Sequence, residues 1–172
     1  MRMPRLKAPA DHPAGFYHCI SRVVDRRFIF GDPEREQFVR FLREYEQLCG
    51  VRVLSYCVLS NHFHLLVEVP KAPDQLPTAD ELIEKLKSLS GAVISAAKAK
   101  QMIHMFRAAR DAQGEAEFCA RFFSRMWDIS EFMKLLKQRF SHWYNRQHAR
   151  KGTLWEERFG SVLIEGAGEA LI

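Results

Sequence analysis

Residues 51–69, VRVLSYCVLSNHFHLLVEV, hold two short apolar runs joined by the polar pair Ser60 and Asn61. Runs rich in β-branched and aromatic residues on both sides of two turn-forming residues are typical of a β-hairpin. The second run carries His62 and His64 at alternate positions. Because alternate residues of a strand point to the same face of a sheet, we expect both imidazoles on one face.

The elements before this hairpin supply half of a known arrangement. Residues 16–23, FYHCISRV, favour a strand, and the apolar residues that recur every three or four positions from Phe38 onward predict a helix. Asp32 is a good N-cap for that helix, and we expect Gly50 to end it. The order strand, helix, strand, strand predicts an α+β fold, with a ferredoxin-like antiparallel sheet and helices on one face.

The second half of the chain reads as helices followed by a last strand. Residues 70–78 contain three prolines, so we expect a linker there. Apolar spacing favours helices over residues 79–148, and strand character returns in residues 154–166. We predict a single domain over residues 1–172, with a core of residues 16–70 and 128–166 and a helical insertion of about residues 71–127.

Composition limits the classes of partner. The chain has 172 residues and a formal net charge of +5, which permits a polyanionic partner but does not identify one. No apolar run approaches the roughly 20 residues of a membrane span, and the N-terminus lacks the apolar segment of a secretory signal. We therefore expect a cytoplasmic protein with no membrane partner. The four cysteines form no C-x-x-C pair, which argues against a zinc knuckle or a disulfide framework.

The histidine pair is the first candidate site. Two imidazoles side by side on a strand are close enough to chelate one divalent ion, although a catalytic metal needs a third protein ligand or positions for water and substrate. From the spacing alone, a cupin-like metal site, a hydrolase site and a pair with no metal role all remain open. Titratable side chains are rare inside apolar runs, which favours a function for His62 and His64.

A basic segment is the second candidate site. Between Phe132 and Trp155 there is no acidic residue, and aromatic residues are interleaved with cations. The cations are Lys134, Lys137, Arg139, Arg146, Arg150 and Lys151. Cations that pair with phosphates beside aromatics that stack on bases are typical of a surface for single-stranded or hairpin DNA. An ordinary amphipathic helix is the alternative. We assign Phe132, Phe140 and Trp143 to the core and the six cations to phosphate contact.

A second basic cluster follows the first expected strand. It consists of Arg22, Arg26 and Arg27, and it is weaker than the first, so on sequence alone we assign it to a solvated turn and not to a binding site.

With these features in view, three stretches of the chain resemble a known family. They are YHCISRVVDRRFIF at 17–30, YCVLSNHFHLLVEVP at 56–70 and FMKLLKQRFSHWYNRQHARKGTLWEERFGSVLIEG at 132–166. They are similar to the single-tyrosine HUH transposases, in particular those associated with repetitive extragenic palindromes.

That resemblance implies a ferredoxin-like catalytic domain that holds a Mg²⁺ or Mn²⁺ ion at the scissile phosphate of single-stranded DNA, commonly beside a hairpin. It also implies a tyrosine that attacks the phosphorus and forms a 5′-phosphotyrosine link. His62 and His64 match the family's metal-ligand pair. Members of the family are monomers or homodimers.

The sequence departs from the family at the nucleophile. The family places its tyrosine on a helix after the strand that here reads GSVLIEG, with Asn or Gln four residues later as a frequent third metal ligand. The sequence ends at Ile172 with no tyrosine beyond Tyr144. We therefore expect the nucleophile to lie after Ile172, and the chain as given to be inactive. Tyr144 is the only candidate substitute, and it aligns with a segment where the family's aromatic residue is not the nucleophile.

Two other functions stay open at this point. The chain could be a module that recognises hairpin DNA or structured RNA without catalysis. It could also be a metal hydrolase, for which Glu68 is the closest candidate base. Glu68 lies four residues beyond His64 on the same face, about 13 Å along a strand, which is too far for direct ligation.

Overall fold

A computed structural model describes residues 7–9, 12–89 and 96–164 of the chain. Four antiparallel strands form one sheet in the order β2-β3-β1-β4. The strands are β1 (Ala14–Arg22), β2 (Arg52–Val58), β3 (His62–Pro70) and β4 (Gly160–Ile164). The central pair is β1 and β3, with β4 and β2 at the edges. This order and the α+β class confirm the fold predicted from the sequence.

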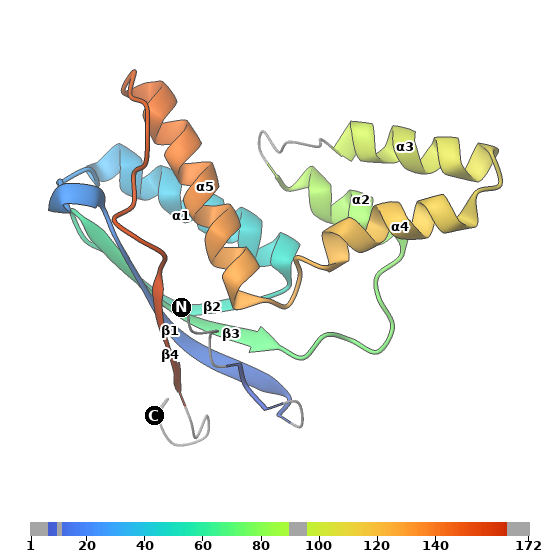
Figure 1. Ribbon diagram of the computed structural model, residues 1–172, viewed down its shortest axis with the longest axis horizontal. Coiled ribbons are helices and arrows are strands. Elements are labelled where there is room, and N and C mark those ends of the chain that lie inside the picture. The colour runs from blue at the N-terminus through green and yellow to red at the C-terminus, as the bar shows by residue number, and fades with distance from the viewer. Residues whose placement is uncertain (1–6, 10–11, 90–95, 165–172) are drawn as a thin grey trace.

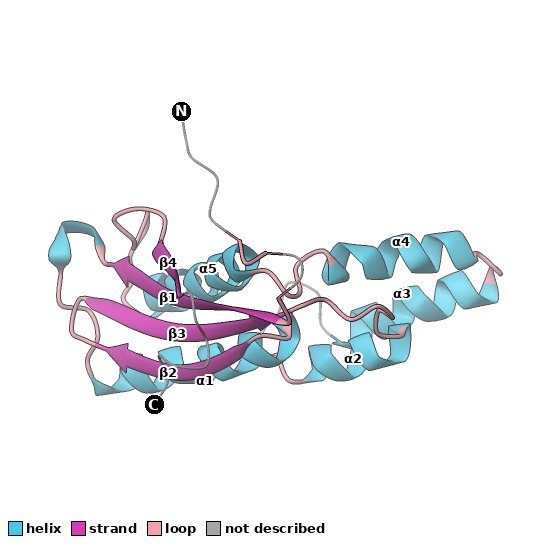
Figure 2. Cartoon of the chain, turned by 90° about the horizontal axis from the view of Figure 1, so that it is seen from below, coloured by secondary structure: helices cyan, strands magenta, loops and turns pink. Residues whose placement is uncertain are grey.

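Helices cover only one face of the sheet. The structure places α1 (Asp32–Cys49) and α5 (Ile129–Gln147) side by side on that face. Figure 1 shows both helices above the sheet, and Figure 2, seen from below, shows the sheet in front of them. No helix of the described residues covers the opposite face, which we call the open face.

Aromatic side chains bind the two layers together. Phe63 of β3 lies with its ring centroid 4.7 Å from that of Phe38 on α1 and 5.6 Å from that of Trp155. Phe140 of α5 stacks on Phe30 at 5.1 Å. All five residues are buried, so the core lies between the sheet and α1 and α5.

The helices between β3 and α5 in the chain form a lobe beside the sheet (Figure 1). It consists of α2 (Ala79–Lys87), α3 (Ala96–Ala108) and α4 (Ala112–Phe123). Leu82, Ile103 and Phe118, one from each helix, are buried within it. At its surface Arg107 of α3 pairs with Asp80 of α2 at 3.2 Å and with Glu115 of α4 at 3.1 Å. The lobe therefore has a small core of its own, with one ion-pair cluster joining all three helices.

Two element boundaries differ from the sequence prediction. Gly31, not Asp32, is the N-cap of α1, because the Glu34 carboxylate accepts the Gly31 backbone N–H at 3.1 Å while Asp32 pairs with Arg35. The last strand begins only at Gly160, since Trp155 is drawn into the core. The other end of α1 agrees with the prediction: Gly50 has φ 63°, the left-handed conformation that glycine adopts without strain.

Candidate functional site

His62 and His64 lie together on the open face of β3. Phe63 and Leu65, at the alternate positions, are fully buried against the helices, whereas both histidines are only partly covered. This confirms the predicted alternation. The two imidazole centroids are 5.2 Å apart, with the ring planes at 66°.

The turn before β3 fixes the position of His62. The Ser60 carbonyl accepts the backbone N–H groups of Ile29 and Phe30, and the Asn61 carbonyl accepts that of Val23. The Asn61 side-chain amide donates to the Arg26 carbonyl at 3.1 Å. Its oxygen therefore faces His62 as an acceptor, 2.7 Å from Nδ1. This arrangement places the His62 proton on Nδ1 and leaves Nε2 as the unprotonated nitrogen.

A third histidine, which the sequence analysis missed, joins the pair. His18 of β1 lies opposite Leu66 in the sheet register, one diagonal step from His64. Its Nε2 is 3.0 Å from His64 Nδ1, and the two rings stack at 5.2 Å with an interplanar angle of 17°. A single histidine in an expected strand carries no signal by itself. Only the pairing of β1 with β3 brings His18 to the site.

The surroundings favour the neutral form of His64. Partial burial lowers its pKa, and repulsion between a protonated His64 and the neighbouring basic groups of His18, His62 and Arg22 lowers it further. A neutral imidazole is the form that binds a metal ion.

The donors present fit two ligands of a divalent ion. His62 Nε2 and His64 Nε2 make no hydrogen bond to other described residues, while Nδ1 of each ring is engaged by a neighbour. An imidazole held through one nitrogen and free at the other is the usual form of a metal-ligating histidine. No group of three His, Cys, Asp or Glu residues within the described ranges is arranged to hold an ion by itself.

Arginines border the histidine pair on the same face. Arg22 lies opposite His62 in the register of β1 and β3. Arg22, Arg26, Asn61 and His62 line a pocket of about 220 Å³. Neither arginine forms an ion pair with any carboxylate of the described chain. Arg26 has φ 52°, an uncommon left-handed conformation for a residue other than glycine. The cluster that sequence reading assigned to a solvated turn therefore lies beside the histidines.

The tyrosines lie away from this face. Tyr17 alternates with His18 on β1 and is buried toward the helices, and Tyr45 is buried on α1. Tyr56 lies opposite Leu65, on the helix side of β2, under the guanidinium of Arg43. Tyr144 belongs to α5 and stacks on His148, with centroids 4.1 Å apart. None of the four tyrosines in the sequence shares the open face with His62 and His64.

The six predicted DNA-binding cations lie on α5 and in the turn after it, and Figure 2 shows α5 behind the sheet, on the side away from the open face. Lys134 is exposed and pairs with Glu131 at 3.0 Å. The Arg139 guanidinium covers the Phe41 ring at 4.7 Å, and Arg150 donates to the Thr153 carbonyl at 3.1 Å. Arg146 and Lys151 are exposed.

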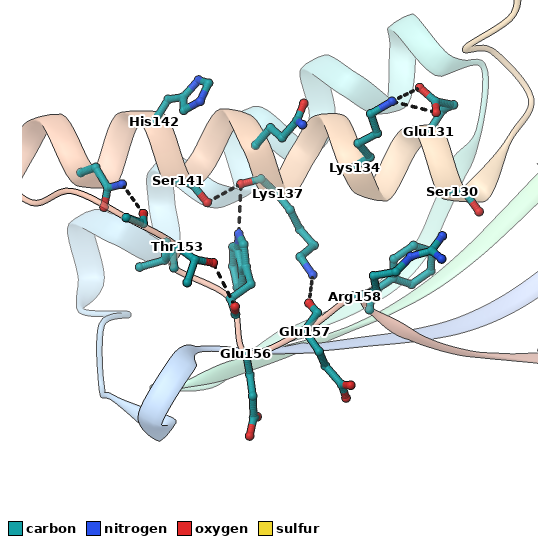
Figure 3. A pocket seen from close by; sticks show the side chains of 16 residues that line it. Ser130, Glu131, Lys134, Lys137, Ser141, His142, Thr153, Glu156, Glu157 and Arg158 are labelled. Atoms are coloured by element: carbon teal, nitrogen blue, oxygen red, sulfur yellow. Dashed lines mark hydrogen bonds and ion pairs between the residues drawn. The ribbon is translucent and has the colours of Figure 1, made fainter. Parts of the chain in front are cut away.

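Lys137 corrects the prediction of phosphate contact. Its side chain is 8% exposed, donates to the Glu157 carbonyl at 2.9 Å and lies 5.3 Å from the Trp155 ring centroid. Figure 3 shows it extending from α5 toward Glu157. Trp155 returns a hydrogen bond from Nε1 to the Lys137 carbonyl at 3.1 Å. Lys137 therefore holds the segment before β4 against α5 and does not face solvent.

We expect Lys137→Ala to lower the free energy of unfolding by about 1–3 kcal/mol, because the Glu157 carbonyl loses its donor and the Trp155 ring loses a contact. Urea denaturation followed by tryptophan fluorescence measures this change. Affinity for single-stranded DNA should stay unchanged in the folded variant, and a selective loss of DNA binding without a loss of stability would contradict the structural role.

The pocket drawn in Figure 3 is a separate feature. It has a volume of about 640 Å³ between α5 and residues 152–159, and neither His62 nor His64 lines it. Its walls carry both signs of charge, because the cations Lys134 and Arg158 and the carboxylates Glu131 and Glu156 all line it. It is therefore not part of the histidine site.

Helices of the described chain include none that is both long and apolar enough to cross a membrane.

Comparisons with known proteins identify a family for the chain. The family model of IS200-like transposases matches residues 14–110, more than half of the chain, including the histidine pair. A REP-associated tyrosine transposase bound to a REP hairpin is 12% identical with a TM-score of 0.52, covering 95% of this chain and 64% of that one. A protein of Deinococcus radiodurans R1 described as a transposase is 16% identical with a TM-score of 0.40, covering 96% of this chain and 87% of that one. A comparison with curated protein sequences gave no match.

The chain thus spans less than two thirds of the REP-associated transposase, and its similarity to that structure concerns the fold. The match to the family model extends over β1, α1, the β2–β3 hairpin, α2 and α3. This chain belongs to the family of IS200-like transposases.

Proposed function

We propose that the open face of the sheet is the metal and DNA site of a transposase that cleaves and rejoins single-stranded DNA through a phosphotyrosine intermediate. The observation that carries this proposal is the donor set of His62 and His64. Both rings are held at Nδ1, and both Nε2 atoms remain available to one ion. When bound, Mg²⁺ or Mn²⁺ would act there as a Lewis acid on the scissile phosphate.

The residues around the pair suit a phosphodiester. Arg22 and Arg26 lie beside His62 and pair with no carboxylate of the described residues, and guanidinium binds phosphate oxygens in a bidentate geometry. Glu68, the candidate base of a hydrolase, forms an ion pair with Arg52 at 2.7 Å and lies opposite Phe16, beyond the histidines. The site therefore favours holding a phosphate over activating water with a carboxylate.

The exposed cations of α5 and of the turn after it are the second part of the proposed DNA surface. Lys134, Arg146 and Lys151 face solvent in the helix layer, with Arg139 and Arg150 near them. A DNA molecule that contacts both parts must reach from the open face of the sheet to the helix layer on the other side (Figure 2). A hairpin next to a single-stranded segment has a shape suited to that path, and the related REP-associated transposase is bound to a hairpin.

The four tyrosines of these 172 residues lie away from the histidine face, so we assign the nucleophile to none of them. We therefore expect the chain as given to bind DNA without forming a covalent link. Tyr144 stacks on His148 in the helix layer and serves packing.

Native and denaturing gels test the proposal together. The 172-residue chain is mixed with labelled single-stranded hairpin DNA in the presence and absence of Mn²⁺. We expect a shift in the native gel that is stronger with Mn²⁺ and that disappears on denaturation. An adduct that survives denaturation would overturn the assignment of the tyrosines. A native-gel shift that is equally strong with and without Mn²⁺, and that persists in His62→Ala, would favour the alternative, a hairpin-binding module without catalysis.

The arginines give a quantitative prediction. Arg22→Ala should weaken binding to single-stranded DNA and lower the slope of log affinity against log salt concentration by about 1, as expected for one lost phosphate contact. Fluorescence anisotropy at several salt concentrations measures both changes. Arg40→Ala removes the same charge from an exposed position of α1 and should leave the slope unchanged. Equal effects of the two substitutions would show that net charge, and not the Arg22 contact, controls binding.

A further inference from the structure

Three histidines, and not two, form a connected group on the open face. His64 lies between His62 and His18: its ring centroid is 5.2 Å from that of each neighbour. The two neighbours meet it differently. His62 approaches at 66° with no hydrogen bond to His64, whereas His18 stacks at 17° and places Nε2 3.0 Å from His64 Nδ1. The distance is that of a hydrogen bond between two imidazoles.

We propose that His18 is a positioning residue that holds His64 in the form that binds the ion. In this arrangement His64 carries its proton on Nδ1 and donates it to His18 Nε2, which leaves His64 Nε2 unprotonated. The proposal rests on the function proposed above. It adds that His18 acts on the metal only through His64.

The contact made by His62 supports this assignment. Asn61 Oδ1 accepts from His62 Nδ1 at 2.7 Å, so the first histidine of the pair is fixed through Nδ1. His18 makes the corresponding contact to the second histidine at 3.0 Å. The two positioning residues come from different places, Asn61 from the turn before β3 and His18 from the neighbouring strand. Each imidazole is thereby fixed through Nδ1, and the two Nε2 atoms are left for one ion.

The competing assignment is that His18 itself binds the ion. It requires the His64 ring proton to be on the other nitrogen. If His18 Nε2 and His64 Nδ1 both faced an ion, His64 Nδ1 would have to be unprotonated and its proton would reside on Nε2. The tautomer of His64 therefore separates the two assignments, and it can be read without any metal present.

Long-range ¹H–¹⁵N NMR spectra of the metal-free chain at pH 7.5 report the tautomer of each histidine. We expect His64 to be mainly the Nδ1–H form in the native chain and to shift toward the Nε2–H form in His18→Ala. The tautomer of His62 should stay unchanged, which provides an internal control. The proposal would be overturned if His64 of the native chain were mainly the Nε2–H form, or if its tautomer did not change in His18→Ala.

Mn²⁺ affinity is the second measurement, read from the electron paramagnetic resonance signal of free Mn²⁺. We expect His18→Ala to weaken binding by about 10–100-fold, the range for loss of a partner behind a metal ligand. His18→Gln, whose amide oxygen can accept from His64 Nδ1, should recover most of the affinity. His142→Ala, on the exposed side of α5, should change nothing. Failure of Gln to restore binding would contradict the positioning role.

The outcomes also separate this inference from the proposed function. If the native chain and His18→Ala bind Mn²⁺ equally well, the metal site stands and only the proposed role of His18 is overturned. A native chain that binds no Mn²⁺ would overturn the metal site, while the NMR tautomers would still decide whether His18 positions His64. Thermal melting of His18→Ala should remain within a few degrees of the native value, so that loss of affinity cannot be attributed to unfolding.

Discussion

Replacing either His62 or His64 with alanine should reduce Mn²⁺ binding by at least about 100-fold, because loss of a partner behind a ligand already costs 10–100-fold and here the ligand itself is lost. The two imidazoles are the only such pair held at Nδ1 with Nε2 available among the residues that the structure describes. The free-ion signal of Mn²⁺ measures the affinity. Mn²⁺ is the suitable probe because thiolate ligands favour softer ions, so the exposed Cys57 opposite His64 contributes little.

The fold should tolerate both substitutions, because the histidines lie on the open face and are not among the buried residues of the core. His142→Ala serves as the matched control, since it removes an imidazole from the helix layer. Retention of full Mn²⁺ affinity in the double variant His62→Ala, His64→Ala would contradict the metal site.

The residue between the two histidines should have the opposite phenotype. Phe63 is fully buried against Phe38 and Trp155, with centroid distances of 4.7 and 5.6 Å. Phe63→Ala should therefore lower the free energy of unfolding by about 3–5 kcal/mol, the range for removing a buried phenylalanine and leaving a cavity. Urea denaturation measures the loss.

Met105→Ala is the control for this prediction. Met105 is 56% exposed on α3, and its substitution should change the free energy of unfolding by no more than about 0.5 kcal/mol. Phe63→Leu keeps an apolar side chain on the buried face and should retain Mn²⁺ binding. A Phe63→Ala variant as stable as the native chain would contradict the placement of β3 at the centre of the core.

Much of the fold could be predicted because the local signals agree with one another. The period of two in residues 62–67 decides which side chains face the helices, and burial against α1 and α5 gives the same answer. The errors occur where tertiary contacts override local pattern. Residues 154–159 have strand-like composition, but Trp155 is drawn into the core and Lys137 holds the Glu157 carbonyl, so pairing begins at Gly160.

The site was less accessible to prediction, because its residues come from separate elements. His18 and Arg22 lie beside the histidine pair because β1 pairs with β3 in a particular register, and that register could not be predicted from the sequence. The burial of Lys137 could have been predicted from the sequence. Lys137 lies one helical turn from Met133 and three residues before Phe140, on the buried side of α5. The prediction counted the cations of the segment without asking which side of the helix each one occupies, and so it missed that Lys137 is buried.

Paramagnetic broadening by Mn²⁺ tests the central claim most directly. Substoichiometric Mn²⁺ is added to the ¹⁵N-labelled chain, and the loss of each amide signal is compared before and after chelation. We expect the strongest broadening at β1 and β3 around His18, His62 and His64, and the weakest in the lobe of α2, α3 and α4. Strongest broadening at the pocket between α5 and residues 152–159, where Glu131, Glu156 and Glu157 offer carboxylates, would contradict it.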